Sequence, residues 1–186
     1  MSDFRRFWRP GGTYFFTLVT ERRAEILTGD LARPLLNAAI ATTKAERPFD
    51  LEAIVLLPDH LHTLWRLPPG DDDYATRLAA AKARFTRAYR AAGGAEQARC
   101  ASRVRRGERA VWQRRFWEHT CRDVEDFKNH LDYVHWNPVK HGYVKCPHAW
   151  PYSTFQKWVA LGVYEPTWRC VCDGRTVEPF EDMDLS

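Results

Sequence analysis

The chain has 186 residues, of which 45% are hydrophobic and 13% aromatic. This is the size of one compact domain with enough apolar side chains for a core, so the composition excludes a wholly disordered protein. No apolar run approaches the roughly 18 residues of a membrane span, and the N-terminal sequence MSDFRRFWRPGG lacks the apolar stretch of a secretory signal. The five cysteines are scattered and do not form the pattern of a disulfide framework. We therefore expect a cytoplasmic protein that does not associate with a membrane.

The net charge of +4 conceals an uneven distribution along the chain. Residues 75–122 contain thirteen basic and only three acidic side chains, whereas the last fourteen residues contain five acidic side chains and one arginine. Arginine accounts for 22 of the 28 basic residues, and its planar guanidinium binds phosphate through two parallel hydrogen bonds. The basic middle of the chain therefore predicts nucleic-acid binding. A solvated helix face in an arginine-rich protein is the alternative.

The first half of the chain predicts the order strand, helix, strand, strand, helix. Residues 13–20 are aromatic and β-branched and follow a Pro-Gly-Gly turn, which is typical of a strand. Apolar residues at helical spacing predict a helix over residues 31–45. Two short apolar strands follow at 51–57 and 60–67, and the Pro58-Asp59 pair between them favours a tight hairpin. Three aspartates at 71–73 then cap a helix that extends to about residue 92.

The second half begins with Gly93-Gly94, which ends that helix. The arginine-rich residues 96–109 show no clear period and predict a mobile loop or a weak helix, and residues 111–120 resemble a strand. A helix over 123–136 is expected to end before Asn137-Pro138, and a short helix within 150–164 is expected to begin at Pro151. The order β-α-β-β-α-β-α predicts an α+β protein of the ferredoxin-like or RRM-like type. In this split βαβ sandwich, helices cover one face of an antiparallel sheet.

A His-x-His motif lies in the second of the two paired strands. Because strand side chains alternate between faces, His60 and His62 point to the same side and can converge on one divalent metal ion. The alternative is that both imidazoles make ordinary hydrogen bonds at the surface of the sheet.

A second motif, Tyr133 and Asn137, lies at the end of the helix predicted over 123–136. Residues four apart share one face of a helix, so a phenol and an amide stand side by side. An amide oxygen is a ligand suited to Mg²⁺ or Mn²⁺, and a phenol can act as a nucleophile. A core tyrosine with a satisfied hydroxyl is the alternative. Three other tyrosines are possible nucleophiles, but none has an amide four residues later at a helix end: Tyr89, Tyr143 and Tyr152.

Three stretches of this sequence occur together in one known family. They are His60-Leu61-His62 after LLPD, WQRRFWEHT at 112–120, and FKNHLDYVHWNPVKHGYV at 127–144. In these residues the chain closely resembles the REP-associated tyrosine transposases, relatives of the single-tyrosine HUH transposases of small insertion sequences. The resemblance extends from about residue 7 to about residue 158.

This resemblance implies the HUH transposase fold and a specific chemistry. It implies that Tyr133 is the catalytic nucleophile and that His60, His62 and Asn137 bind Mg²⁺ or Mn²⁺. The family acts on single-stranded DNA at repeated extragenic palindromes, where it recognises a hairpin and cuts beside it. The implied function is a metal-dependent nickase and strand transferase with a 5′-phosphotyrosine intermediate, acting as a monomer in preference to the dimers of the insertion-sequence relatives.

Candidate DNA contacts come from the N-terminal arm, from the basic loop at 99–115 and from the end of the tyrosine helix. They are Arg5, Arg6, Trp8, Arg103, Arg105, Arg106, Arg114, Arg115, His135, Lys140 and His141. Three aromatic residues of the basic loop either stack on bases or pack in the core: Trp112, Phe116 and Trp117. We divide the chain into a transposase domain at 1–165, which includes the basic and aromatic arm, and an acidic tail at 166–186.

Two alternatives to strand transfer remain at this point. One is a protein that binds hairpin DNA or RNA on the same fold without cleaving it, and the other is a metallohydrolase that uses bound water in place of the tyrosine. A zinc site formed by Cys146 and His148 with Cys170 and Cys172 is disfavoured, because one residue separates each pair where two to four are usual.

Overall fold

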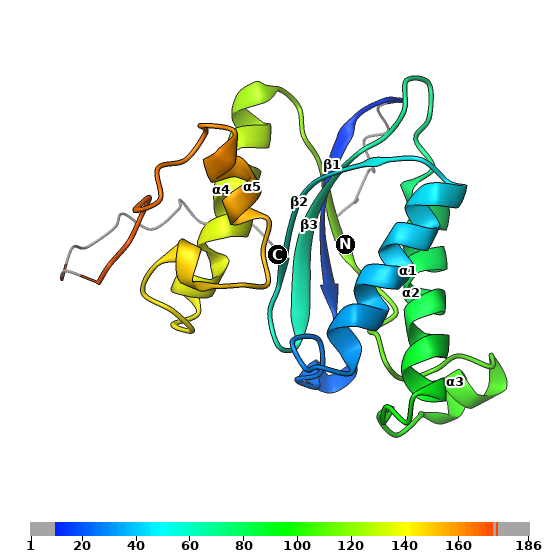
Figure 1. The fold of residues 1–186 in the computed structure, drawn as a ribbon. Coiled ribbons are helices and arrows are strands. Elements are labelled where there is room, and N and C mark those ends of the chain that lie inside the picture. The colour runs from blue at the N-terminus through cyan, green and yellow to red at the C-terminus, as the bar shows by residue number, and fades with distance from the viewer. Residues whose placement is uncertain (1–9, 173, 175–186) are drawn as a thin grey trace, which may run out of the picture.

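A computed structural model of the protein describes residues 10–172 and 174. A four-stranded antiparallel sheet forms its centre, with the strand order β2-β3-β1-β4 (Figure 1). The strands are β1 (Thr13–Val19), β2 (Asp50–Leu56), β3 (His60–Arg66) and β4 (Trp117–Thr120). The helices are α1 (Ala32–Glu46), α2 (Tyr74–Ala91), α3 (Ala101–Arg105), α4 (Val124–Lys140) and α5 (Phe155–Ala160), with short 3₁₀ turns η1 (Glu21–Arg23) and η2 (Pro147–Ala149).

The register of the sheet places the two histidines in its most protected strand. β3 pairs with β2 on one side and with β1 on the other, and His62 lies opposite Thr17 of β1 and Val55 of β2. The tight hairpin predicted at Pro58-Asp59 joins β2 to β3. A central strand lacks free edges, so the positions of its side chains are fixed by both neighbours.

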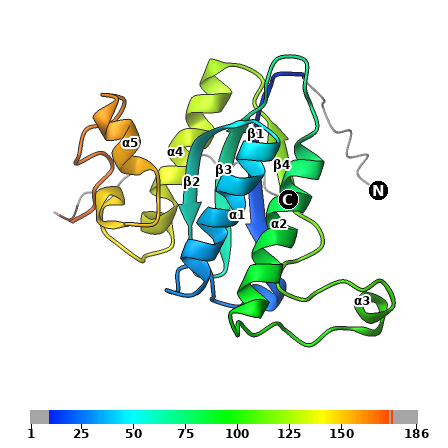
Figure 2. The same ribbon diagram turned by 45° about the vertical axis from the view of Figure 1, so that its right-hand side comes forward.

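The α+β class and the antiparallel sheet are confirmed, but the helices cover both faces of the sheet. Helices α1 and α2 pack on one face, and α4 lies on the other with α5 beside it (Figures 1 and 2). The expectation of helices on a single face was wrong because β1 is apolar on both sides. Tyr14 and Phe16 belong to the core under α1 and α2, whereas Phe15 belongs to the core under α4. A continuous apolar run is typical of a strand that is buried on both faces.

Helix α4 extends further than its sequence predicts. Pro138 lies inside the helix, which ends only at Lys140. Its terminus is a Schellman motif, in which the amide of Tyr143 donates to the Pro138 carbonyl (2.9 Å) and the amide of Gly142 donates to the Val139 carbonyl (2.9 Å). Gly142 has a φ of 72°, the left-handed conformation that this motif requires. The glycine, and not the proline, therefore ends the helix.

Two other predicted elements are shorter in the structure, and the arginine-rich loop is partly helical. In the segment 111–120 only β4 is a strand, although Trp112 forms an isolated bridge with Thr20. The arginine-rich loop contains the five-residue helix α3, and the last helix begins at Phe155 and not at Pro151. Residues of the predicted tail up to 172 pack against the fold, since the Trp168 ring lies 4.4 Å from the Tyr164 ring, centroid to centroid. Across the described residues, every helix is too short or too polar to cross a membrane.

Candidate active site

Two buried histidines of β3 face helix α4. His60 and His62 have their ring centroids 5.0 Å apart, and both rings point to the face of the sheet that carries Phe15 and Leu64. The ring of His62 stacks on Phe15 at 5.5 Å and contacts the Tyr133 ring of α4 at 5.2 Å. The alternation of strand side chains therefore brings both imidazoles to the helix that carries the predicted nucleophile.

Each histidine is oriented by a hydrogen bond at Nδ1. His60 Nδ1 lies 2.6 Å from Oδ1 of Asp59, and Asp59 Oδ2 accepts a second bond from Arg23 at 2.7 Å. His62 Nδ1 lies 2.8 Å from the hydroxyl of Thr17, its cross-strand partner. With Nδ1 engaged in each ring, Nε2 is the nitrogen that can coordinate a metal ion, the arrangement that metal-binding histidines commonly show.

Helix α4 adds Tyr133 and Asn137 to the two imidazoles. Tyr133 is 4% exposed and Asn137 is fully buried, one turn further along the same helix face. The amide nitrogen of Asn137 contacts the Tyr133 carbonyl at 3.4 Å, which leaves Oδ1 as its ligand atom. Asn137 Oδ1 and His62 Nε2 are both buried, and neither makes a well-aligned hydrogen bond among the described residues, although the Asn137 side chain lies close enough to His62 to favour its protonated form.

These unsatisfied atoms fit a divalent metal ion. A buried polar atom without a partner costs about 1–3 kcal/mol, and coordination would remove that cost for both atoms. The Nε2 atoms of His60 and His62 and the Oδ1 atom of Asn137 together offer two nitrogens and one hard oxygen. Three protein ligands leave positions open for phosphate oxygens and water.

Burial keeps both imidazoles neutral. It lowers the pKa of His60 below its usual value, although the Asp59 carboxylate opposes this effect, and it lowers the pKa of His62 further with help from the neighbouring His60 and His141. Burial alone would raise the pKa of Asp59, but the hydrogen bonds from His60 and Arg23 outweigh it and the pKa is lowered. A metal ion needs neutral imidazoles, so the ligands are in the required form at neutral pH.

Two residues of the predicted DNA-binding set lie beside this site. Lys140 Nζ is 4.9 Å from the centroid of the Tyr133 ring, a cation–π distance, and the ring of His141 is 5.3 Å from that of His60. Both side chains are exposed at the end of α4. Both side chains therefore border the candidate site at the Tyr133 end.

Two other predicted DNA contacts are buried. His135 follows Tyr133 by two residues on α4, so it lies about 200° around the helix and points away from the candidate site. It is fully buried, and its Nε2 lies 2.9 Å from the Thr154 hydroxyl. Arg103 is 6% exposed, and its guanidinium binds the Glu21 carboxylate and the carbonyl oxygens of Arg109 and Trp112. Both residues therefore hold the fold together, and the expectation that they contact DNA is corrected.

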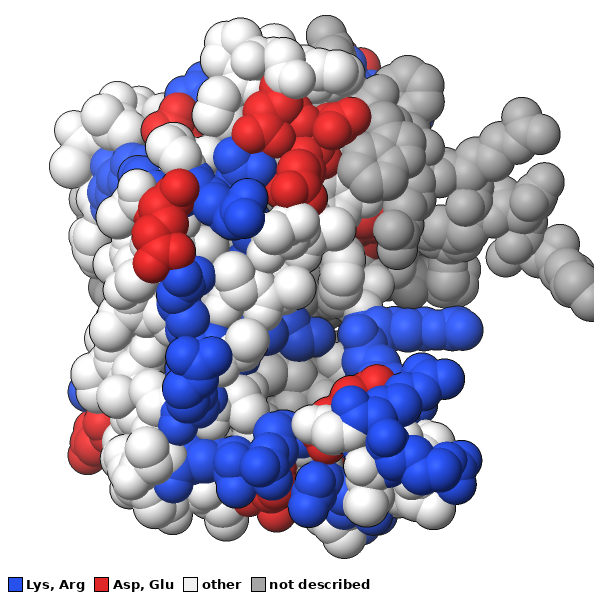
Figure 3. All heavy atoms as spheres, turned by 90° about the vertical axis from the view of Figure 1, so that its right-hand side faces the viewer, with Lys and Arg blue, Asp and Glu red and all other residues white. Residues whose placement is uncertain are grey.

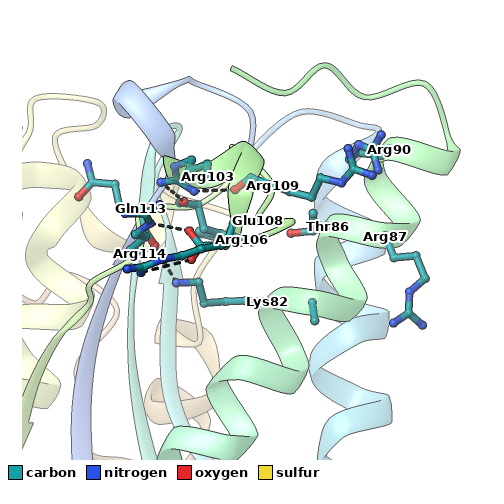
Figure 4. Close-up of a pocket in the computed structure, with 12 residues that line it drawn as sticks. Lys82, Thr86, Arg87, Arg90, Arg103, Arg106, Glu108, Arg109, Gln113 and Arg114 are labelled. Atoms are coloured by element: carbon teal, nitrogen blue, oxygen red, sulfur yellow. Dashed lines mark hydrogen bonds and ion pairs between the residues drawn. The ribbon is translucent and has the colours of Figure 1, made fainter. Parts of the chain in front are cut away.

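The remaining arginines of the basic loop surround a hollow next to α2. Figure 3 shows lysine and arginine side chains gathered around this hollow, and Figure 4 shows its lining. The cavity has a volume of about 740 Å³. Besides Arg103, its cationic lining residues are Lys82, Arg87, Arg90, Arg106, Arg109 and Arg114, and Glu108 adds one negative charge. Arg105 and Arg115 are also exposed in this part of the chain.

Lys82 forms the inner part of this basic pocket. Its Nζ donates to the Gln113 carbonyl at 2.9 Å, and burial together with the nearby Arg103 lowers the pKa of Lys82 to about 8. Gln113 in the pocket wall and His60 of β3 lie on either side of β1. The Gln113 amide donates to the Val19 carbonyl, and Val19 is the cross-strand partner of His60. The basic pocket and the candidate active site therefore share one end of the sheet, on opposite faces.

The aromatic residues of the basic loop belong to the core. Trp112 packs on Phe85 at 5.3 Å, Phe116 packs on Phe16 at 6.1 Å, and Trp117 packs on Phe15 at 5.4 Å, measured between ring centroids. Base stacking is thus not their main role. Arg5, Arg6 and Trp8 of the predicted arm lie outside the described residues.

Sequence reasoning missed the residues that support the ligands. Asp59 was recognised only as a hairpin residue, although a carboxylate adjacent in sequence to a candidate ligand is a usable signal. Thr17 and Lys82 carry no such signal, because the Thr17 contact depends on the strand register and the Lys82 contact depends on how the basic loop packs on α2.

Comparison with known proteins agrees with this geometry. Residues 11–137 match the model of the IS200-like transposase family. The chain is 42% identical over 169 residues to a REP-associated tyrosine transposase of Escherichia coli K12, with 90% of this chain and 91% of that protein covered. It is 42% identical over 170 residues to a putative REP-associated tyrosine transposase of Haemophilus influenzae, which covers 90% and 93% of the two chains.

A solved structure has the same fold. It is a REP-associated tyrosine transposase bound to a REP hairpin, and it matches 97% of this chain and 98% of its own with 40% identity and a TM-score of 0.74. The family match spans both His60 and Asn137, the outermost residues of the candidate site. The chain therefore belongs to the IS200-like transposases and, within them, to the REP-associated tyrosine transposases.

Proposed function

We propose that this protein cleaves and rejoins single-stranded DNA beside a REP-type hairpin, with Tyr133 as the nucleophile and with Mg²⁺ or Mn²⁺ bound by His60, His62 and Asn137. The observation that carries the proposal is the convergence of these four buried side chains, two of which present polar atoms without a well-aligned hydrogen bond among the described residues. A protein that only binds DNA needs neither buried unsatisfied ligands nor a tyrosine beside them.

The reaction is a transesterification that conserves the phosphodiester bond. The phenol oxygen of Tyr133 gives up its proton and attacks the phosphorus, and the bond from phosphorus to the upstream 3′ oxygen breaks. The products are a 5′-phosphotyrosyl link and a free 3′-hydroxyl, which leaves with a proton. Attack of a 3′-hydroxyl from another strand on this link reverses the step and releases Tyr133.

The protein groups around the tyrosine have separate tasks in this reaction. A bound divalent cation supplies charge stabilisation for the non-bridging phosphate oxygens. Asp59 and Thr17 hold the two imidazoles in the orientation that presents Nε2. Lys140 lies over the Tyr133 ring and offers a positive charge beside the developing anionic centre.

The proposed substrate follows from the relatives and from the charge of the surface. The related solved structure contains a REP hairpin, and in this chain the basic pocket offers arginines at the same end of the sheet as the site. Arginine forks suit the phosphates of a strand that continues past the cleavage point. All four site residues come from one chain, so we propose that a monomer suffices.

A covalent-capture experiment tests this function. Hairpin oligonucleotides with flanking single strands, taken from palindromes repeated in the source genome and labelled at the 3′ end, are incubated with protein and Mg²⁺ or Mn²⁺. We expect label to migrate with the denatured protein, and we expect no adduct with EDTA or with Tyr133→Phe. Cleavage that persists in Tyr133→Phe without an adduct would favour a water-dependent nuclease. Binding without cleavage of every hairpin would favour the non-catalytic protein.

A further inference from the structure

A second group of metal-binding side chains lies after the catalytic helix. The loop that follows α4 carries Cys146 and His148, and the segment that follows α5 carries Cys170 and Cys172. These two segments lie next to each other in both ribbon views (Figures 1 and 2), and the amide of Val171 donates to the Lys145 carbonyl at 2.8 Å. The fold thus brings together two pairs that are more than twenty residues apart in sequence.

The distances between these side chains match a tetrahedral site. Cys146 Sγ lies 3.5 Å from Cys172 Sγ, and Cys170 Sγ lies 3.7 Å from His148 Nδ1. The ligand atoms of Cys146, His148 and Cys170 all lie within 4.8 Å of one another. Zinc–ligand bonds of about 2.3 Å for sulfur and 2.0 Å for nitrogen put tetrahedral ligands about 3.6–3.8 Å apart. The ligand atoms of Cys146, His148 and Cys170 need only small side-chain movements to reach this geometry. Cys172 approaches Cys146 but lies outside this group of three, so its exposed side chain must turn further towards the other two ligands.

The backbone explains the short spacing of the first pair, Cys146 and His148. Cys146 has extended dihedral angles and is followed directly by the 3₁₀ turn η2, which carries His148. The sequence rule of two to four intervening residues describes ligands on a single tight loop, whereas here each facing segment supplies two ligands. The spacing in the sequence disfavours a zinc site, but the three-dimensional arrangement of the side chains does not.

Two alternatives to a metal site fit less well. A disulfide needs sulfur atoms about 2.05 Å apart, and Cys146 and Cys172 are free thiols at 3.5 Å. His148 Nδ1 also lies 3.0 Å from the Pro166 carbonyl, a single contact that coordination through Nδ1 would replace. Neither alternative explains why a third thiol, Cys170, lies within reach of the same point.

A contrasting cluster shows what a satisfied histidine and carboxylate group looks like in this protein. His119, Asp126 and His130 also lie close together, but Asp126 Oδ2 accepts from Arg122 at 2.9 Å and lies 2.8 Å from His119 Nε2. His130 Nδ1 is within 2.8 Å of the Asp126 carbonyl. The arginine already balances this carboxylate, so the cluster is a structural hydrogen-bond network.

We propose that Cys146, His148, Cys170 and Cys172 bind one zinc ion in a closed Cys₃His site. Thiolates favour zinc, whereas the site of His60, His62 and Asn137 contains no sulfur and suits a harder cation. Binding would release the thiol protons and would tie residues 170–172 to the loop that begins where α4 ends. With four protein ligands and no open position, the site is structural and takes no part in DNA chemistry.

Zinc content tests this proposal in the full chain. Protein without a histidine tag, loaded with zinc and freed of excess metal in Mg²⁺ buffer, is expected to retain about one zinc ion per chain by mass spectrometry of the metal. Cys172→Ser removes an exposed ligand with little effect on packing and is expected to lose most of this zinc. Cys100→Ser is the matched control, because Cys100 is also exposed but lies outside the cluster.

Cobalt spectroscopy gives a second readout that does not depend on a variant that folds. Co²⁺ added to the zinc-free wild-type chain is expected to produce the visible bands of a tetrahedral site and thiolate charge-transfer absorption. Retention of zinc in a His60→Ala, His62→Ala double variant would separate this site from the catalytic one. Absence of both zinc and cobalt bands in the wild-type chain, equal zinc in Cys172→Ser, or zinc lost only from the double variant would overturn the proposal.

Discussion

The contact between Asp59 and His60 offers a direct test of how the proposed metal site is supported. Asp59→Asn keeps the size of the side chain and an oxygen that can accept from Nδ1 of His60, but it removes the negative charge. The present contact is short, at 2.6 Å, and the Asp59 side chain is 13% exposed. Bonds to a charged group contribute about 1.5–3 kcal/mol and neutral ones about 0.5–1.5 kcal/mol.

The substitution is therefore expected to cost about 1–2 kcal/mol of metal-binding free energy. At about 1.4 kcal/mol for each tenfold change, this equals roughly a five- to thirtyfold rise in the Mn²⁺ dissociation constant. This range overlaps the loss of about 10–100-fold that is typical for partners of histidine ligands. Arg23 is mainly exposed, so its ion pair with Asp59 contributes little to this figure.

The assay is a Mn²⁺ titration without DNA, followed by electron paramagnetic resonance of the free ion, together with the Mn²⁺ dependence of cleavage. Asp30→Asn serves as the control, because Asp30 is a fully exposed carboxylate that forms an ion pair with Arg33. A dissociation constant for Asp59→Asn that equals that of Asp30→Asn would refute the orienting role of Asp59. A lower melting temperature of the metal-free variant would instead indicate a structural role.

Four further predictions follow from burial and charge. Tyr133→Phe is expected to abolish the covalent adduct but to keep hairpin binding and thermal stability, because the ring contacts with His62 and Phe15 remain; lost binding would contradict the assigned role. Arg103→Ala is expected to lower the free energy of unfolding by about 2–4 kcal/mol in urea titrations, since it strips Glu21 of its partner. Arg106→Ala, at the exposed rim of the basic pocket, is expected to leave stability unchanged and to reduce the salt dependence of DNA binding by up to about 0.7 in log–log slope. Burial lowers the pKa of His135 to about 3 in the folded chain, whereas in the unfolded chain it is the ordinary 6.5. The folded state therefore has its full stability above pH 6.5 and loses stability as the pH falls from 6.5 towards 3, because only the unfolded chain takes up the proton there. At pH 5.5 this loss is about 1.4 kcal/mol, and His135→Gln should lose that much less stability than the wild type between pH 7.5 and 5.5; equal losses would show that His135 does not titrate as described.

The pairing of the candidate site residues within each element is predictable from the sequence because their spacing is local. His60 and His62 share a face in any strand, and Tyr133 and Asn137 share a face in any helix. The family resemblance then joins the two pairs, which the sequence alone leaves 71 residues apart. Their meeting in space depends on the packing of α4 against β2 and β3, which no local pattern encodes.

The errors have equally specific causes. Because a helical residue before proline is disfavoured, the sequence predicts that α4 ends before Asn137. In the structure the helix continues to Lys140 and ends at the Schellman motif that contains Gly142. The basic loop was treated as one cationic surface, but its charges divide into the buried Arg103 and the exposed Arg106 and Arg114. Charge density predicts binding of phosphate in general, and only the contacts of each guanidinium show which groups the protein itself already occupies, among them the exposed Arg114, which binds Glu108 and Ser102.

The end of α4 joins the two proposed metal sites through one short stretch of chain. Asn137 needs a helical backbone to bring Oδ1 to His62, yet Pro138 follows it directly and cannot donate a backbone hydrogen bond. The Schellman motif then satisfies the Pro138 and Val139 carbonyls at the helix end, and the loop after Gly142 leads within four residues to Cys146. A zinc ion at Cys146 would hold this loop at its far end, opposite the helix terminus. Removal of zinc should therefore loosen the last turn of α4 first, and the Mn²⁺ affinity of the catalytic site should fall with it while the sheet keeps its stability.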